Sequence, residues 1–147
     1  MFCLKLFSQN IEQFNFSITV HPSGGIQGFS INVNENKLDI ITRSPKIINN
    51  KIVLGDSINR EIVLLTRRNR KRLNSILTEV KTVPSVKRSE YFVMLDVWLV
   101  DFLFEPNKII QVNSSFIGGR EKYLPLKKLL KYLQKISKTD ISLRGLV

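Results

Sequence analysis

Residues 91–104 form the longest apolar run of the chain, and the pattern around them predicts the centre of the fold. The run holds aromatic, β-branched, Leu and Met residues and is broken only by Asp96 and Asp101. Both faces of such a strand are apolar, which is typical of a strand that is covered on both sides. A Pro-Asn pair within 105–108 favours a turn, so the sequence predicts a long hairpin over 91–112 that lies inside the sheet.

The N-terminal half of the chain shows the apolar–polar alternation of strands that are buried on one side only. This alternation predicts a three-stranded antiparallel meander over 14–42. Further short strands are expected at 2–7 and 61–65. The segment 44–59 is polar and turn-rich, with room for one short strand at 52–54.

Apolar residues at helical spacing predict two amphipathic helices. The first is expected over 67–81, after Thr66, whose hydroxyl can cap its N-terminus. The second is expected over 122–138, with Pro125 in its first turn, and 113–122 is expected to be a loop. The apolar stripes consist of Leu73, Ile76, Leu77 and Val80 in the first helix and Leu126, Leu129, Leu130, Leu133 and Ile136 in the second.

These elements together predict a two-layer α+β fold. An antiparallel sheet of about six or seven strands would carry both helices on one face. With 147 residues, of which 43% are hydrophobic, the chain suits one globular domain over 1–147 with a substantial core. Because both apolar stripes would then face the sheet, the cations of the two helices would point outward.

The charge of the chain is strongly positive and unevenly placed. Lys and Arg number 23 against 12 Asp and Glu, a net charge of +11. Residues 60–90 and 120–147 each carry a net +6, whereas 91–119 carry −2, so the excess lies in the two helical segments. A field of this sign attracts anionic partners. The alternative is an ordinary domain whose lysines keep it soluble.

The expected basic surface lies on the outer sides of both helices. The cluster within 67–72 opens the first helix near the positive end of its dipole, which costs stability and attracts an anion. A solvated helical face without a ligand is the alternative interpretation. The predicted anion-binding residues are Arg67, Arg68, Arg70, Lys71, Arg72, Lys127, Lys128, Lys131 and Lys135.

Three kinds of anionic partner fit such a surface. The first hypothesis is a non-catalytic interaction protein that binds an acidic protein partner, of the inhibitor or immunity type. The alternative is a nucleic-acid-binding accessory protein that contacts phosphates through the same surface. The aromatic residues fall at strand positions and not among the cations, so no stacking platform for single strands is evident. Membrane-surface binding by the basic Leu-rich helix is the third hypothesis.

Catalytic, metal and cofactor signatures are missing from the sequence. Cys3 is the only cysteine, so no Cys-based zinc site can form. His21 is the only histidine, and because Cys3 and His21 lie apart in sequence without flanking motif residues, no Cys/His arrangement is indicated. His21 is expected at a solvent-facing strand end. Asp96 and Asp101 have odd spacing, which places them on opposite faces of a strand, and each is expected at a sheet margin or paired with Lys or Arg. The glycines of 24–28 favour a hairpin turn over a phosphate loop.

The chain is therefore expected to be no enzyme, to use no cofactor, and to take no small-molecule substrate. The apolar run of about 14 residues in 91–104 is too short for a membrane-spanning helix. Residues 1–12 lose their apolar character early and lack a small-residue cleavage site, so secretion is not expected. We expect a cytoplasmic protein.

The order of elements also carries a resemblance. A hairpin with Gly24 and Gly25, a meander, a strand entering a helix capped by Thr66, the strand pair 91–112 and the Leu-rich helix 126–136 resemble small uncharacterised α+β proteins of Bacteroidota. Some similarly sized α+β proteins are immunity partners that block a toxin by binding it. The resemblance thus implies a protein-binding role and assigns no functional residue.

Overall fold

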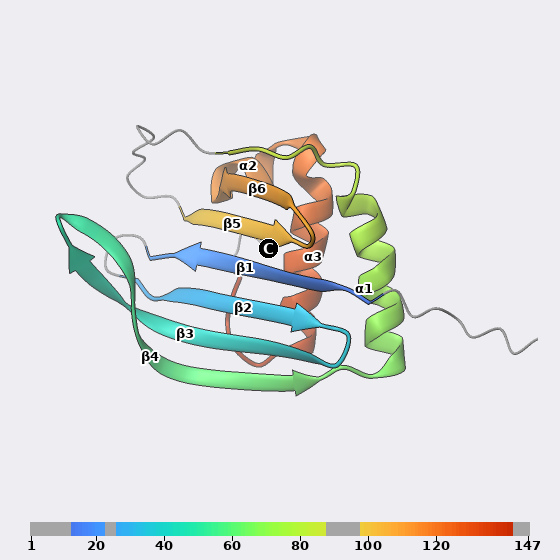
Figure 1. The fold of residues 1–147 in the computed structure, drawn as a ribbon, viewed down its shortest axis with the longest axis horizontal. Helices are drawn as coiled ribbons and strands as arrows, with labels where there is room; N and C mark the ends of the chain where they lie inside the picture. Colours follow the sequence, from blue (N-terminus) through green and yellow to red (C-terminus); the bar gives the residue numbers. More distant parts are fainter. Residues whose placement is uncertain (1–12, 23–25, 88–97, 143–147) are drawn as a thin grey trace, which may run out of the picture.

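The computed structural model describes residues 13–22, 26–87 and 98–142, which form a sheet with a layer of helices on one face (Figure 1). The expected strand at 2–7 and the first half of the expected hairpin, 91–97, lie outside the described residues.

Six strands form one sheet in the order β4-β3-β2-β1-β5-β6, and all neighbouring strands are antiparallel. The strands are β1 (Asn15–His21), β2 (Gly28–Asn34), β3 (Lys37–Ile48), β4 (Lys51–Leu64), β5 (Leu99–Phe104) and β6 (Lys108–Asn113). The helices are α1 (Arg67–Val80), α2 (Ser114–Gly119) and α3 (Leu124–Ile136), with a 3-10 turn, η1 (Glu121–Tyr123), before α3. The prediction of an α+β fold with an antiparallel sheet is confirmed.

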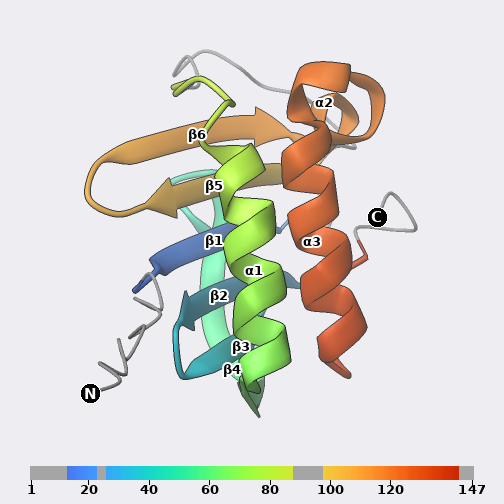
Figure 2. The same ribbon diagram turned by 90° about the vertical axis from the view of Figure 1, so that its right-hand side faces the viewer.

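Both long helices cross the strands on the same face of the sheet (Figure 2). The predicted cap is present, because Thr66 Oγ1 accepts a hydrogen bond from the backbone N–H of Asn69 at 3.1 Å. The expectation of a loop over 113–122 is wrong, since α2 and η1 occupy this segment. Asn113 Oδ1 accepts from the N–H of Phe116 at 3.0 Å and so caps a short helix.

The hairpin of β3 and β4 is longer than the composition of 44–59 predicts. Its turn residues, Asn49 and Asn50, have φ angles of 51° and 60°, a left-handed conformation that Asn tolerates. The register of the two strands is irregular on both sides of Arg43. These irregularities interrupt the alternation of side chains, which explains why the sequence pattern indicates only one short strand in this segment.

The core lies between the sheet and the helix layer, as the two apolar stripes predict. Leu77 and Ile136 are half-buried at its margin. The helices bury Leu73, Ile76, Val80, Leu126, Leu129, Leu130 and Leu133 against sheet residues that include Ile18, Ile31, Ile40, Phe102 and Ile110. Burial of apolar area of this kind is the main stabilising contribution to a domain of this size.

β5 lies between β1 and β6, so the described part of the apolar run is inside the sheet, as predicted. The expectation that both of its faces are covered is wrong for 99–104. Phe102 is fully buried under the helices, but Leu103 on the opposite face is 46% exposed. Both long helices lie on one side of the sheet, and no described helix covers its other face, which we call the open face (Figure 2).

Candidate functional site

α1 and α3 lie side by side and run antiparallel (Figure 2). α1 begins directly after β4, and the residues that follow α3 return to the same strand. There the backbone N–H groups of Lys138 and Thr139 each donate to the Glu61 carboxylate at 2.8 Å. This arrangement brings the first turns of α1 next to the last turns of α3.

A groove runs between the two helices on the outer side of the layer. Its volume is about 790 Å³. We call it the α1–α3 groove, and it is lined by Arg68, Asn69, Lys71, Arg72, Ser75, Ile76, Lys128, Lys131, Tyr132, Lys135 and Ile136.

Six of the nine predicted anion-binding residues meet in this groove. They are Arg68, Lys71, Arg72, Lys128, Lys131 and Lys135. Within each helix these cations share one flank, as residues three, four and seven apart can do. The two helices present these flanks to each other, so cations that are more than 50 residues apart in sequence lie along one groove.

The other three predicted residues do not line the groove. Arg67 and Arg70 fall on the opposite flank of α1, and the guanidinium of Arg70 turns back to donate from Nη1 to the carbonyl oxygen of Leu65 at 3.1 Å. Lys127 shares the far flank of α3 with Gln134, whose amide donates to a backbone carbonyl beyond the helix at 2.9 Å. Sequence spacing alone did not separate the two flanks, because which flank faces the neighbouring helix depends on the tertiary fold.

Carboxylates do little to offset the groove's charge within the described part of the chain. Among its six cations only Lys128 has an ion pair there, with Nζ at 3.0 Å from Glu79 Oε2. Both side chains of this pair are nearly half exposed, at 44% and 47%, so the pair contributes little to stability. The potential of the groove is therefore strongly positive.

This gathering of cations costs stability. Arg68 and Arg72 are four residues apart on α1, and Lys128, Lys131 and Lys135 follow one another at three and four residues on α3. Each such like-charge pair destabilises a helix by about 0.2–0.5 kcal/mol. The buried leucine and isoleucine stripes hold the helices in place despite this repulsion, which a bound anion would relieve.

The floor of the groove is apolar. Ile76 is only 2% exposed, and Tyr132 and Ile136 pack beside it, half-buried. Burial raises the pKa of the Tyr132 hydroxyl above its ordinary value of 10.0, and the nearby charges of Arg68 and Arg72 partly offset that rise. The phenol therefore stays neutral at physiological pH and offers a hydrogen-bond donor at the floor of the groove, between the cations of the two helices.

The open face of the sheet carries a different kind of polar cluster. Arg60 donates two hydrogen bonds to Asp39, from Nε at 2.9 Å and from Nη2 at 2.6 Å. These bonds hold the pKa of Asp39 below its ordinary value of 3.8. On β1 and β5, His21 Nε2 lies 2.7 Å from Asp101 Oδ2. Asp101 thus meets His21, where the sequence suggested a sheet margin or a Lys or Arg partner, and His21 is only partly exposed at its strand end.

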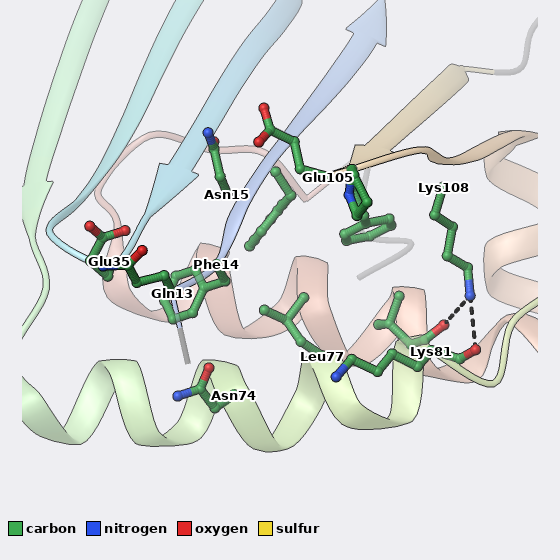
Figure 3. Close-up of a pocket in the computed structure, with 13 residues that line it drawn as sticks. Gln13, Phe14, Asn15, Glu35, Asn74, Leu77, Lys81, Glu105 and Lys108 are labelled. Atoms are coloured by element: carbon green, nitrogen blue, oxygen red, sulfur yellow. Dashed lines mark hydrogen bonds between the residues drawn. The ribbon is translucent and has the colours of Figure 1, made fainter. Parts of the chain in front are cut away.

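A second cavity lies at the end of the sheet beside the other flank of α1 (Figure 3). Its volume is about 910 Å³, and its walls combine the aromatic rings of Phe14, Phe16 and Phe104 with the carboxylates of Glu35 and Glu105. The ammonium of Lys108 donates to the last carbonyl oxygens of α1 and its cap at 3.1 and 2.9 Å, as Figure 3 shows. Burial lowers the pKa of Lys108. This lysine closes the C-terminal end of α1 and does not add to the basic groove.

Neither a metal centre nor a membrane-spanning helix is found in the described part of the chain. No group of three or more His, Cys, Asp and Glu side chains there is placed to hold a metal ion. None of the described helices combines the length and the apolar content needed to cross a membrane.

Comparison with protein-family models, curated proteins and solved structures finds no match for this chain. The resemblance of its element order to small α+β proteins of Bacteroidota therefore stays an expectation from sequence.

Proposed function

We propose that this protein is a non-catalytic interaction protein that binds an acidic protein partner through the α1–α3 groove, in the manner of an inhibitor or immunity protein. The proposal rests on one observation. Six cations from two helices line one groove, and five of them have no ion pair with a carboxylate of the described residues. Such an arrangement lowers the stability of the free protein and favours an anionic ligand.

The floor of the groove favours a protein over a nucleic acid. The half-buried Tyr132 and Ile136 form apolar surface below the cations, above the buried Ile76. The side chains of Asp and Glu carry their charge on short apolar stems, and neighbouring apolar residues of a protein partner can pack on this floor. A phosphate backbone would meet the cations and leave the apolar floor unused. Interfaces between proteins commonly combine such an apolar centre with a charged rim.

Co-purification from the native cell with matched variants tests the proposal. The groove variant combines Arg68→Glu, Arg72→Glu and Lys131→Glu, and the control variant combines Lys46→Glu, Lys51→Glu and Lys87→Glu. All six side chains are exposed, and both variants change the net charge equally. We expect a discrete stoichiometric complex with a protein that survives nuclease treatment, persists in the control variant and is lost in the groove variant.

Two outcomes would contradict the proposal. Nucleic acid that dominates the purified material, with an affinity that falls steeply with salt, would favour the alternative of a phosphate-binding accessory protein. Equal loss of the complex in both variants would show that total charge, and not the α1–α3 groove, determines the binding.

A further inference from the structure

The two edges of the sheet differ in how they are closed. At the β6 edge, Val86 forms a parallel bridge: its N–H donates to the carbonyl oxygen of Ile109 at 3.0 Å, and its carbonyl accepts from the N–H of Gln111 at 2.7 Å. At the β4 edge, no strand or bridge of the described chain pairs with the outer side. Within the described structure, β6 is thus bridged on its outer side at one position, whereas β4 presents an edge without a bridge.

The outward backbone groups of β4 belong to Arg60, Ile62 and Leu64. The N–H of Leu65 donates inward to the carbonyl oxygen of Asn36 at 2.8 Å. In an antiparallel pair, residues alternate between those that bond to the partner strand and those that point away from it. The regular register of β3 and β4 over 59–64 then turns the N–H and C=O groups of these three residues outward.

The side chains along this edge are unusually apolar for a free edge. Ile62 is 48% exposed and Leu64 is 76% exposed on the open face of the sheet. Free edges are usually protected by charged residues, Pro or irregularities, because they pair readily with other strands. Here the irregular register begins only beyond Asn59, which leaves 59–64 straight and accessible.

The edge itself carries both signs of charge, since Arg60 is paired with Asp39 and Glu61 accepts from the backbone N–H of Lys138. The cations nearest in sequence are the arginines that open α1, which β4 enters directly after Thr66. In Figure 2 the first turn of α1 and the last turn of α3 lie on the β4 side of the sheet, and the α1–α3 groove includes Arg68 and Ile136 from these turns. A second copy of the chain, also at +11, would bring two basic surfaces together, whereas an acidic segment is complementary in charge.

We propose that β4 accepts an extended acidic segment of the partner protein as an additional strand of the sheet. This inference rests on the proposed function and names how the partner is held. The backbone of the segment pairs with the outward groups of Arg60, Ile62 and Leu64. Its apolar side chains pack on Ile62 and Leu64, and its acidic residues continue toward the groove. Strand addition of this kind obtains affinity from main-chain hydrogen bonds and specificity from alternate side chains.

Amide hydrogen exchange, measured by NMR on the ¹⁵N-labelled full chain, tests the proposal. The probe is a blocked peptide of alternating Glu and Val, of about eight residues, long enough to cover the straight edge. We expect saturating peptide to slow exchange at Arg60, Ile62 and Leu64 roughly tenfold or more, as a new backbone hydrogen bond would. The matched control is the same peptide with N-methyl groups on alternate residues, which cannot pair and should give no such slowing.

A protein variant provides the reciprocal test. Ile62→Pro removes an outward N–H and leaves the inward ladder intact, and Pro is tolerated at such edge positions. We expect it to weaken binding of the Glu-Val peptide roughly tenfold, whereas Ile62→Thr, which keeps the N–H, loses less. If Ile62→Pro fails to fold, the comparison of the two peptides still decides the question.

The outcomes separate this inference from the proposed function. Peptide binding that shifts amides of the groove but leaves Arg60, Ile62 and Leu64 unprotected would overturn strand addition and leave the proposed function standing. Protection of these amides without peptide, rising with protein concentration, would assign the edge to a second copy and also overturn it. An absence of any response in the groove would count against the proposed function itself.

Discussion

The two outer faces of this protein differ in how their charged side chains are paired. On the open face of the sheet, Arg60 forms two hydrogen bonds with Asp39, and His21 lies within 2.7 Å of Asp101. On the outer face of the helix layer, six cations line one groove, and Lys128 alone among them has an ion pair within the described chain.

This difference indicates what each face does. Paired groups on the sheet stabilise the fold, because removing one partner leaves the other without its bonds. Unpaired like charges on the helices destabilise it. A local arrangement that conflicts with stability is expected where a surface serves another purpose, and here the groove's composition favours binding of an anionic partner.

The largest expected effect on stability comes from breaking the pair on the sheet. Asp39 is only 7% exposed, so Asp39→Asn should lower the free energy of unfolding by about 1–3 kcal/mol. Urea denaturation measures this change. Asp56→Asn is the control, because Asp56 is exposed on the same hairpin and its substitution should stay within about 0.5 kcal/mol. Equal effects of both substitutions would contradict a structural role for the Asp39–Arg60 pair.

Lowering the pH should also remove the stability that the Asp39–Arg60 pair contributes, because it protonates the carboxylate. Hydrogen bonds from Arg60 lower the pKa of Asp39 below 3.8. Burial alone would raise the pKa of Glu61, but hydrogen bonds from Thr139 and Lys138 lower it below 4.5. The unfolded chain therefore binds more protons in this range, and stability should be full above about pH 5 and fall as the pH drops through these values.

The urea midpoint measured against pH checks this expectation. Asp39→Asn and Glu61→Gln should each flatten the acidic part of the curve, since each removes one of the groups that gains protons on unfolding. A decline confined to neutral or alkaline pH would contradict the assignment.

Charge reversal in the groove should raise the free energy of unfolding, whereas the substitutions on the sheet lower it. Lys131→Glu converts the like-charge contacts of Lys131 with Lys127, Lys128 and Lys135 into attractive ones, so we expect a gain of about 0.5–1 kcal/mol in unfolding free energy. The same variant should bind an anionic partner more weakly. Lys51→Glu, with the same change in net charge on the β3–β4 hairpin, should show no comparable gain. A loss of stability in Lys131→Glu would mean that its ammonium has a structural role.

The smallest effect is expected for the ion pair that the groove has within the described residues. Glu79→Gln should change the unfolding free energy by less than about 0.5 kcal/mol, because the pair with Lys128 is exposed. It should nevertheless tighten the binding of a short oligoglutamate peptide at low salt, since it frees Lys128, and the difference should vanish as salt is added. Unchanged affinity at low salt would show that Lys128 does not contribute to the site.

Much of the fold could be predicted from periodicity. The apolar stripes of both helices, the cap at Thr66 and the alternation of β1 and β2 are local patterns with a direct physical cause. The β3–β4 hairpin is harder to predict, because two register irregularities and an Asn-Asn turn break the alternation of apolar and polar residues that marks a strand. α2 was missed because its cap, Asn113, precedes a helix of only six residues.

The sequence predicts that the candidate site is a basic surface on two helices, but it does not predict which of the nine cations line the groove. Helical spacing assigns the cations to two outer faces, and the groove brings together six of the nine. The exclusion of Arg70 depends on a hydrogen bond to Leu65 that no spacing reveals. The contact between His21 and Asp101 joins residues 80 positions apart, so it follows from the order of the strands and not from any local motif.

An NMR titration of the ¹⁵N-labelled protein with a short oligoglutamate peptide at low salt tests the central claim most directly. If the α1–α3 groove is the anion-binding surface, amide shifts will concentrate at Arg68, Arg72, Lys131 and Lys135 and will disappear in the variant that reverses Arg68, Arg72 and Lys131. Shifts of equal size at Lys46 and Lys51, or shifts that persist in that variant, would contradict it.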